Sequence, residues 1–246
     1  MKIIIVPDVH GRTFWRKCKD LINSIDKIIF LGDYLDPYVD IDPEEALEEF
    51  KQIIEFKKEN PDKVILLIGN HDCGYFPELL SSYSCRRYEK AKYEISNLFM
   101  DNLNLFDLTY AYDKYLFSHA GIVPEWFDYI KSERFFNIYK IENKDEFLNL
   151  QLTDLSPLLT MNNGIKALWM ISRDRGGRDS YGSCIWADIH EHIGYYWNKP
   201  LEGWYQIFAH SLYYPNLNDY FINENLAMLD CAKLFTLDEN GIIEVC

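Results

Sequence analysis

The first seventy residues alternate short apolar runs with segments of helical pattern. The apolar runs lie at 3–6, 27–31 and 63–68, and helical patterns at 13–24 and from Asp42 onward separate them. Runs that are apolar throughout, rather than alternating, are typical of strands buried on both faces of a parallel sheet. This third of the chain is therefore predicted to be α/β, with a parallel sheet.

The helix that opens near Asp42 carries its own start signals. Asp42 suits the N-cap, Pro43 the first helical position and Glu45 the capping-box position. Leu47 and Ile54 follow at a spacing that places both on one apolar face. We therefore expect an amphipathic helix between the second and third strands.

The second half of the chain has a different pattern. Runs at 106–112 and 115–118 predict a hairpin, and a mostly helical stretch follows at about 124–165. Short strands are expected at 206–209, 227–230, 233–236 and 241–245. Because no internal repeat or Ser/Gly linker separates the halves, we interpret residues 1–246 as one domain with a helical insertion at about 124–165.

Composition and charge narrow the class of protein. The chain has 246 residues, of which 48% are hydrophobic, which is enough for a core and excludes a disordered protein. Its 39 acidic and 25 basic side chains give a net charge of −14. Non-specific nucleic-acid binding depends on Lys and Arg, so this charge argues against it. It does not exclude a polyanionic substrate held through bound metal ions.

The cysteines and apolar runs bear on location. The six cysteines form no Cys-x-x-Cys pair and no framework spacing, which is typical of reduced thiols. The apolar run before Pro7 is too short for the core of a signal peptide. No stretch approaches the ~18 apolar residues of a membrane span. We expect a cytoplasmic protein with no membrane partner.

Polar side chains follow directly after five of the predicted strands. They are Asp8 and His10, Asp33 and Asp36, Asn70 and His71, His119, and His210. One histidine after a strand is more often a structural residue than a ligand. Five such segments at the carboxyl ends of strands predict convergence on one site, because unpaired burial of so many acids would be costly. The donors suit Mn, Fe or Zn.

The order of these motifs resembles the calcineurin-like metallophosphoesterase superfamily. The motifs are Asp8-Val9-His10, Gly32-Asp33 with Asp36, Gly69-Asn70-His71-Asp72, Ser118-His119-Ala120-Gly121 and Ala209-His210. The resemblance is closest to the phosphoprotein phosphatase and symmetric diadenosine tetraphosphate hydrolase branch, and it spans Asp8 to about Asp230. It implies an α/β fold of four layers, an α/β/β/α sandwich of two mixed sheets.

The resemblance also implies roles for single residues. Asp8, His10 and Asp33 would hold a first metal ion. A second ion, bridged by Asp33, would be completed by three further ligands, Asn70, His119 and His210. Manganese is the preferred metal, with iron and zinc as alternatives. His71 resembles the general acid that protonates the leaving oxygen, Asp36 would orient it, and Asn70 would also contact substrate.

The chain departs from the family pattern in the phosphate clamp. Asp36 is followed by Pro37-Tyr38, where the family usually has Arg-Gly, so one substrate arginine is missing. A second family arginine is matched to Arg175, because it follows Leu168-Trp169-Met170; Arg173 and Arg178 are the alternatives. The competing interpretation is a charged loop with surface ion pairs of little energetic value.

Three functions follow from this pattern. The first is a metal-dependent phosphomonoesterase resembling the phosphoprotein phosphatases, acting on a phosphorylated protein, nucleotide or small ester. The second is a hydrolase of diadenosine polyphosphates, or a phosphodiesterase, which the missing arginine favours. The third is a catalytically silent protein-binding scaffold, against which the complete ligand set argues.

Two further histidines lie close together in His190-Glu191-His192. On a helix their side chains would point to different faces, which argues against a shared metal ion. We expect this stretch to be a solvated helical segment.

Overall fold

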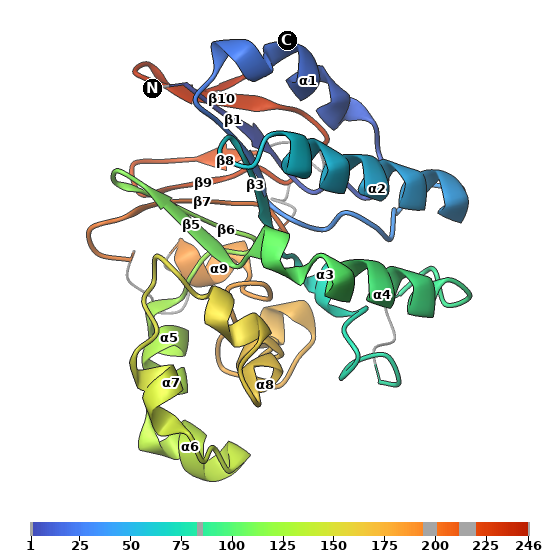
Figure 1. Ribbon diagram of the computed structural model, residues 1–246. Coiled ribbons are helices and arrows are strands. Elements are labelled where there is room, and N and C mark those ends of the chain that lie inside the picture. The colour runs from blue at the N-terminus through green and yellow to red at the C-terminus, as the bar shows by residue number, and fades with distance from the viewer. Residues whose placement is uncertain (1, 83–85, 194–200, 212–219, 246) are drawn as a thin grey trace. The chain divides into compact units, whose positions relative to one another are not determined.

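The computed structural model describes residues 2–82, 86–193, 201–211 and 220–245 (Figure 1). The chain divides into two compact units, the first formed by Met1–Phe106 with Cys231–Cys246 and the second by Asp107–Asp230. One mixed sheet belongs to the first unit and another to the second. The predicted fold class, α/β with two mixed sheets and helices, is confirmed.

The first sheet contains three parallel strands at the three apolar runs of the first seventy residues, as predicted. Its strand order is β11 (Gly241–Glu244), β10 (Phe235–Asp238), β1 (Ile3–Val6), β2 (Lys27–Phe30), β3 (Val64–Leu67) and β4 (Phe106–Asp107). β1, β2 and β3 run parallel, with Ile4 beside Ile28 and Ile28 beside Val64. β10 runs antiparallel to β1, with Ile4 opposite Thr236. All residues of β1 and β3 are buried, as their apolar runs predict.

The helices of the first unit are of unequal length. They are η1 (Phe14–Arg16), α1 (Lys17–Leu21), η2 (Ile22–Ser24), α2 (Pro43–Glu59), α3 (Asn70–Cys73), α4 (Lys92–Asp101) and η3 (Leu103–Leu105). The predicted helix at 13–24 is thus broken into three short pieces. α2 begins as its sequence predicts, with Pro43 in its first turn and the Asp42 side chain accepting a 2.8 Å bond from the Glu44 N–H.

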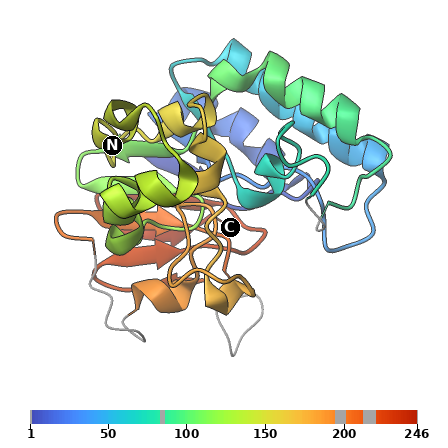
Figure 2. The same cartoon turned by 90° about the horizontal axis from the view of Figure 1, so that it is seen from below.

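An aromatic cluster fixes α2 in the first unit. The Phe50 ring of α2 lies 5.1 Å from Tyr34, 4.6 Å from Phe99 of α4 and 6.1 Å from Phe106 of β4, measured between centroids. Figure 2 shows α2 and α4 side by side. Tyr34 lies in the loop after β2, so this cluster supports the loop that carries Asp33.

The second unit combines a five-stranded sheet with short helices. The strand order is β5 (Thr109–Tyr112), β6 (Tyr115–Ser118), β7 (Tyr205–Phe208), β9 (Leu226–Met228) and β8 (Phe221–Ile222). The helices are α5 (Pro124–Ile130), α6 (Glu133–Tyr139), α7 (Lys144–Leu148), η4 (Ser156–Leu159), α8 (Gly164–Leu168), η5 (Arg173–Arg175) and α9 (Ile189–His192). The stretch at 124–165 is helical, as expected; its status as an insertion in a single domain stays a prediction. No helix in the described part of the chain combines the length and apolarity that a bilayer crossing requires.

The prediction of one strand over 106–112 was wrong. Phe106–Asp107 forms β4 of the first sheet, whereas Thr109–Tyr112 forms β5 of the second. Leu108, between them, is fully buried, and its N–H donates to Ser156 Oγ at 3.2 Å. A run of apolar residues looks the same whether it continues in one sheet or changes sheets, so the pattern did not reveal the break.

Candidate metal centre and active site

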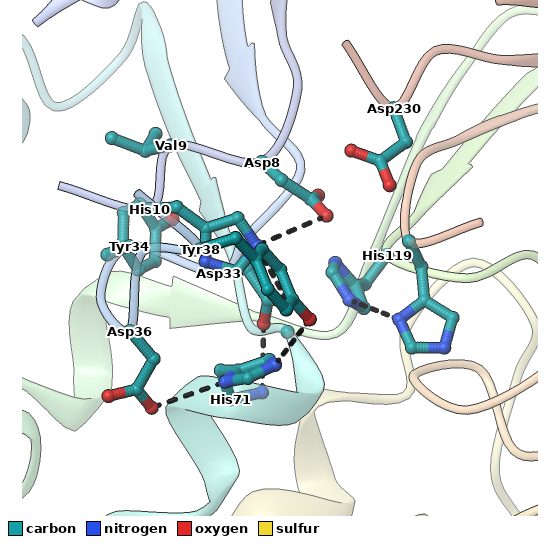
Figure 3. A network of polar contacts seen from close by, with 12 residues as sticks. Asp8, Val9, His10, Asp33, Tyr34, Asp36, Tyr38, His71, His119 and Asp230 are labelled. Carbon is teal, nitrogen blue, oxygen red and sulfur yellow. Dashed lines mark hydrogen bonds and ion pairs between the residues drawn. The ribbon is translucent and has the colours of Figure 1, made fainter. Parts of the chain in front are cut away.

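The first ligand group consists of Asp8, His10 and Asp33, in the loops after β1 and β2 of the first unit. All three are at most 4% exposed. His10 Nε2 lies 3.9 Å from Asp8 Oδ2 and 3.7 Å from Asp33 Oδ2 (Figure 3). His10 Nδ1 lies 2.7 Å from the Leu35 carbonyl oxygen, the arrangement in which Nδ1 carries the proton and Nε2 keeps its lone pair.

The chemistry of this group fits a divalent metal ion. Its carboxylate oxygens and imidazole nitrogen lie within 4.8 Å of one another and are buried. Burial, the dominant influence, lowers the pKa of His10 to about 4 although the charge of Asp33 opposes the shift. A neutral imidazole between two carboxylates is the protonation state that a metal ion requires. This donor set suits manganese, iron or zinc.

Backbone strain is concentrated among the predicted site residues. Of the seven non-glycine residues with positive φ in the described chain, four are predicted site residues: His10 (47°), Asp33 (51°), Asp36 (60°) and His210 (67°). This left-handed conformation costs an ordinary residue of order 1–3 kcal/mol. The loops at the strand ends therefore hold these side chains in directions that an unstrained backbone would not give.

His71 and Asp36 form the pair that the resemblance implies. His71 Nδ1 lies 3.2 Å from Asp36 Oδ2 (Figure 3). Asp36 Oδ1 accepts from Tyr75 Oη at 2.6 Å and from the Arg87 backbone N–H at 3.0 Å. Asp36 is fully buried, so these bonds fix its carboxylate against the imidazole. Burial by itself would lower the pKa of His71, but the charges of Asp33 and Asp36 and the bond to Asp36 raise it above its usual value.

Asn70 and His71 begin α3, and Asp72 ties that helix to the loop of Asp33. The His71 N–H donates to Asp33 Oδ1 at 2.9 Å. The Asp72 carboxylate accepts from the backbone N–H groups of Asp33, Tyr34 and Gly69 at 2.8, 3.0 and 2.9 Å. Burial, together with the charge of Asp33, raises the pKa of Asp72. The sequence interpretation gave Asp72 no role, although its place directly after His71 marked it as a buried acid.

The second unit brings two predicted ligands together, the histidine pair His119 and His210. β6 and β7 are parallel neighbours, and His119 and His210 follow their carboxyl ends. His119 Nε2 lies 3.2 Å from His210 Nδ1, and both residues are buried (Figure 3). The Ala209 N–H donates to the His119 carbonyl at 2.8 Å, which fixes one loop to the other.

Arg175 lies beside this pair. Its Nη2 donates to the His210 carbonyl oxygen at 3.3 Å, and its Nη1 lies 3.6 Å from Asp188 Oδ2. The Arg175 side chain is 27% exposed, whereas Arg173 and Arg178 are exposed residues. Of these three arginines, Arg175 is thus the one whose hydrogen bond fixes it to the loop of His210, a predicted ligand.

The prediction of a solvated segment at 190–192 was wrong. Glu191 and His192 are buried, and His192 Nε2 lies 3.0 Å from the Ala120 carbonyl oxygen. A Cβ on Gly121, which has a φ of +82°, would overlap the His192 imidazole. The Asp188-x-x-Glu191 spacing is a capping box, and this helix-start signal would have marked an anchored helix.

The predicted site residues thus fall into two sets, one in each unit. Asp8, His10, Asp33, Asp36, Asn70 and His71 lie in the first unit, and His119, Arg175 and His210 lie in the second. Within each unit the structure brings the members together. A dinuclear centre with ligands from both units stays a prediction.

Residues 1–231 match the family model for calcineurin-like phosphoesterases. The chain belongs to this family. It is therefore a metallophosphoesterase, a hydrolase of phosphate esters in a family that depends on a pair of metal ions. No curated protein matches the sequence.

Two solved structures show the fold of this metallophosphoesterase in other proteins. The cold-active protein-tyrosine phosphatase of a psychrophilic Shewanella is 17% identical with a TM-score of 0.50, and the match covers 99% of this chain and 77% of that one. A protein serine/threonine phosphatase from Saccharomyces cerevisiae is 14% identical with a TM-score of 0.54, covering 100% and 79%. At these identities the likeness establishes a shared fold.

Proposed function

We propose that this metallophosphoesterase hydrolyses phosphate monoesters, with His71 as the general acid. The observation that carries the proposal is the hydrogen bond between His71 Nδ1 and the buried carboxylate of Asp36. A carboxylate at Nδ1 stabilises the imidazolium and leaves Nε2–H as the proton to be donated. His71 would give that proton to the ester oxygen as its bond to phosphorus breaks, and Asp36 would hold the ring in place.

The ligand scheme of this proposal uses both units. Asp8, His10 and Asp33 would hold one ion, and Asp33, Asn70, His119 and His210 would hold the other. Bound ions of this kind supply an activated water near neutral pH and stabilise the charge that develops on phosphate. Manganese is the proposed activator, because oxygen and imidazole donors suit it, with iron and zinc as alternatives.

The general-acid role is tested with His71→Asn. We expect turnover of p-nitrophenyl phosphate to fall by about 10²- to 10⁴-fold, the usual contribution of a general acid, while the metal content stays unchanged. Asp36→Asn should also lower turnover and keep the metal. A folded His71→Asn protein that has lost its metal ions along with its activity would make His71 a ligand and overturn the assignment.

A phosphodiesterase or a dinucleotide polyphosphate hydrolase is the second candidate function. Pro37 and Tyr38 occupy the positions where the family usually has Arg-Gly, so one arginine contact to the charged phosphate is missing. Turnover of p-nitrophenyl phosphate and bis-p-nitrophenyl phosphate, each with added manganese, separates the two. Faster monoester turnover supports the first proposal, and faster diester turnover supports the second.

Phosphorylated proteins are the proposed class of substrate within the monoesters. The two similar structures are named as a protein-tyrosine phosphatase and a protein serine/threonine phosphatase. Release of phosphate from phosphotyrosine and phosphoserine peptides, compared with nucleoside monophosphates, tests this choice. Equilibrium dialysis that finds no bound divalent metal would instead favour the non-catalytic scaffold.

A further inference from the structure

Tyr38 reaches the predicted proton donor although most of it is exposed. Tyr38 is 68% exposed, one of the exposed large hydrophobic residues of the surface. Yet its hydroxyl lies 3.3 Å from His71 Nε2, and its ring contacts His10 edge-on with centroids 5.1 Å apart (Figure 3). The polar end of this exposed ring therefore lies at the nitrogen from which the leaving oxygen would take its proton.

Arg87 lies against the same ring. Its guanidinium carbon is 5.0 Å from the Tyr38 ring centroid, a cation–π distance. The Arg87 backbone N–H donates to Asp36 Oδ1, which fixes its main chain to the carboxylate that orients His71. Arg87 is itself an exposed residue. The guanidinium is thus held over Tyr38 and is open to solvent.

The residues on either side of Arg87 are both buried. Arg86, directly before it, is buried and donates from Nη1 to the Gly74 and Leu79 carbonyls at 2.6 and 3.1 Å, and from Nη2 to Leu80 at 2.6 Å. Tyr88, directly after it, is buried. The segment that carries Arg87 is thus held to the first unit by its two neighbours, which limits where the exposed guanidinium can lie.

Several carboxylates are buried in the first unit around the predicted site. Asp8, Asp33, Asp36 and Asp72 are all buried in this unit near the metal ligands. Two other guanidinium groups of this unit are bonded to backbone carbonyl oxygens: that of Arg86 is buried, and that of Arg12 donates to Asp8 and Val9 at 3.0 Å each. Arg87 is therefore the cation in the described part of this unit that combines an anchored backbone near His71 with a solvent-exposed guanidinium.

We propose that Arg87 and Tyr38 together bind the phosphate group of the substrate and select a dianionic phosphate monoester. The inference rests on the proposed function and deepens it. Arg87 takes the place of the clamp arginine that Pro37 displaces, reaching the phosphate from a different segment of the chain. Tyr38 holds the guanidinium by its ring and presents its hydroxyl beside His71 Nε2.

The preference for monoesters follows from charge and position. The leaving oxygen must come within hydrogen-bond distance of His71 Nε2, where the Tyr38 hydroxyl now lies, so the hydroxyl must then bond to the substrate instead. The guanidinium forms charge-assisted hydrogen bonds with the phosphate oxygens. A monoester dianion carries one more charge than a diester, so Arg87 strengthens its binding more.

Kinetics of Arg87→Gln test the proposal. A hydrogen bond to a charged group contributes about 1.5–3 kcal/mol, so we expect kcat/KM for p-nitrophenyl phosphate to fall at least tenfold. The value for bis-p-nitrophenyl phosphate should change much less. Inhibition by inorganic phosphate should weaken by a similar factor of about ten. Arg134→Gln, which removes an exposed arginine from α6 of the second unit, is the matched control.

Tyr38→Phe tests the hydroxyl separately from the ring. We expect a loss of about two- to twelvefold in kcat/KM on the monoester, the effect of about 0.5–1.5 kcal/mol from one hydrogen bond. Tyr93→Phe is the control, because Tyr93 is 66% exposed, close to the 68% of Tyr38. Arg87→Lys keeps the charge but not the planar fork, so its activity should lie between that of the wild type and Arg87→Gln.

The outcomes separate this inference from the proposed function. If the wild type hydrolyses the monoester and Arg87→Gln matches Arg134→Gln, the inference is wrong and the proposed function stands. Equal losses on monoester and diester would overturn the dianion preference. If the wild type hydrolyses neither ester, the proposed function fails. The inference about Arg87 is then tested by calorimetric titration of the manganese-loaded protein with inorganic phosphate. Tenfold weaker phosphate binding by Arg87→Gln then supports the inference; equal binding, or none by the wild type, overturns it.

Discussion

At the scale of single residues, several strained backbone positions carry predicted site residues. His10, Asp33 and Asp36 have φ values of 47°, 51° and 60°, in a region that non-glycine residues rarely adopt. Each follows a buried strand, and each carries a polar side chain into a buried group. Such strain persists only where the surroundings over-determine the conformation, and it is concentrated at functional sites.

Asp72 is the residue that holds two of these loops together. Asp72→Asn should lower the free energy of unfolding by about 2–3 kcal/mol, because the amide cannot accept from all three backbone N–H groups that bind the carboxylate. Urea unfolding monitored by circular dichroism measures this. Asp62→Asn, at an exposed position, is the control. A loss no greater than that of the control would mean that the three bonds add little.

His192 should make stability depend on pH. Burial, the main cause, lowers its pKa to about 4 in the folded protein, against about 6.5 for an unperturbed histidine. The folded state therefore prefers the neutral imidazole, so its contribution is complete above about pH 6.5 and is lost as the pH falls toward 4. Between pH 7 and pH 5 the loss is about 2 kcal/mol.

Urea unfolding of the wild type and His192→Gln at pH 7 and pH 5 isolates this contribution. Glutamine keeps a donor for the Ala120 carbonyl but does not titrate. The wild type should lose about 2 kcal/mol more than the variant over this interval. Equal losses would show that His192 titrates alike in the folded and unfolded states.

The sequence indicated the candidate site residues but not the side chains around them. Asp8, His10 and His71 could be singled out because motifs of fixed local spacing carry them. Tyr38 and Arg87 are brought together by the fold from distant segments, so no local pattern indicates their contact. His192 was misjudged because burial depends on what the rest of the unit places over a helix.

At the scale of elements, the start of α2 was predicted from its local chemistry. Asp42→Ala should destabilise the protein by about 1 kcal/mol, because it removes the side-chain bond to the Glu44 N–H at 2.8 Å. Asp40→Ala, two residues earlier and also exposed, removes the same charge without that bond. Thermal unfolding of both variants measures the difference, and equal midpoints would show that the cap contributes nothing.

Strands were predictable where burial alone defines them. β1, β2 and β3 are apolar runs between helices, and all three were found. The pairing of β1 with β10 was not, because strands so far apart along the chain share no local signal. The break at Leu108 also escaped detection, since the choice between two sheets is made by the backbone path and not by side-chain polarity.

At the scale of the whole chain, the first unit is built from both ends of the sequence. It consists of Met1–Phe106 and Cys231–Cys246, and β10 of the second segment pairs with β1 of the first. A chain that ends at Asp230 lacks β10 and β11 and leaves one edge of β1 unpaired. We expect it to lose the fold of the first unit, and with it the manganese binding proposed above, as measured by proteolysis and equilibrium dialysis.

A milder pair of substitutions tests the same point. Phe235→Ala, at a fully buried position of β10, should cost about 3–5 kcal/mol. Ile243→Ala in β11, where the side chain is 49% exposed, should cost much less. Urea unfolding gives both values. Similar costs would mean that β10 contributes no more to the core than the edge strand.

The pairing of β1 with β10 also sets an order of events during synthesis. More than two hundred residues separate the two strands. At ribosomal rates of 5–20 residues per second, β10 is therefore synthesised about ten to forty seconds after β1. In that interval the edge of Ile3–Val6 is an uncovered β-branched strand, the kind of segment that pairs with other chains. A nascent chain of this protein is therefore expected to depend on holding chaperones until its last strands emerge.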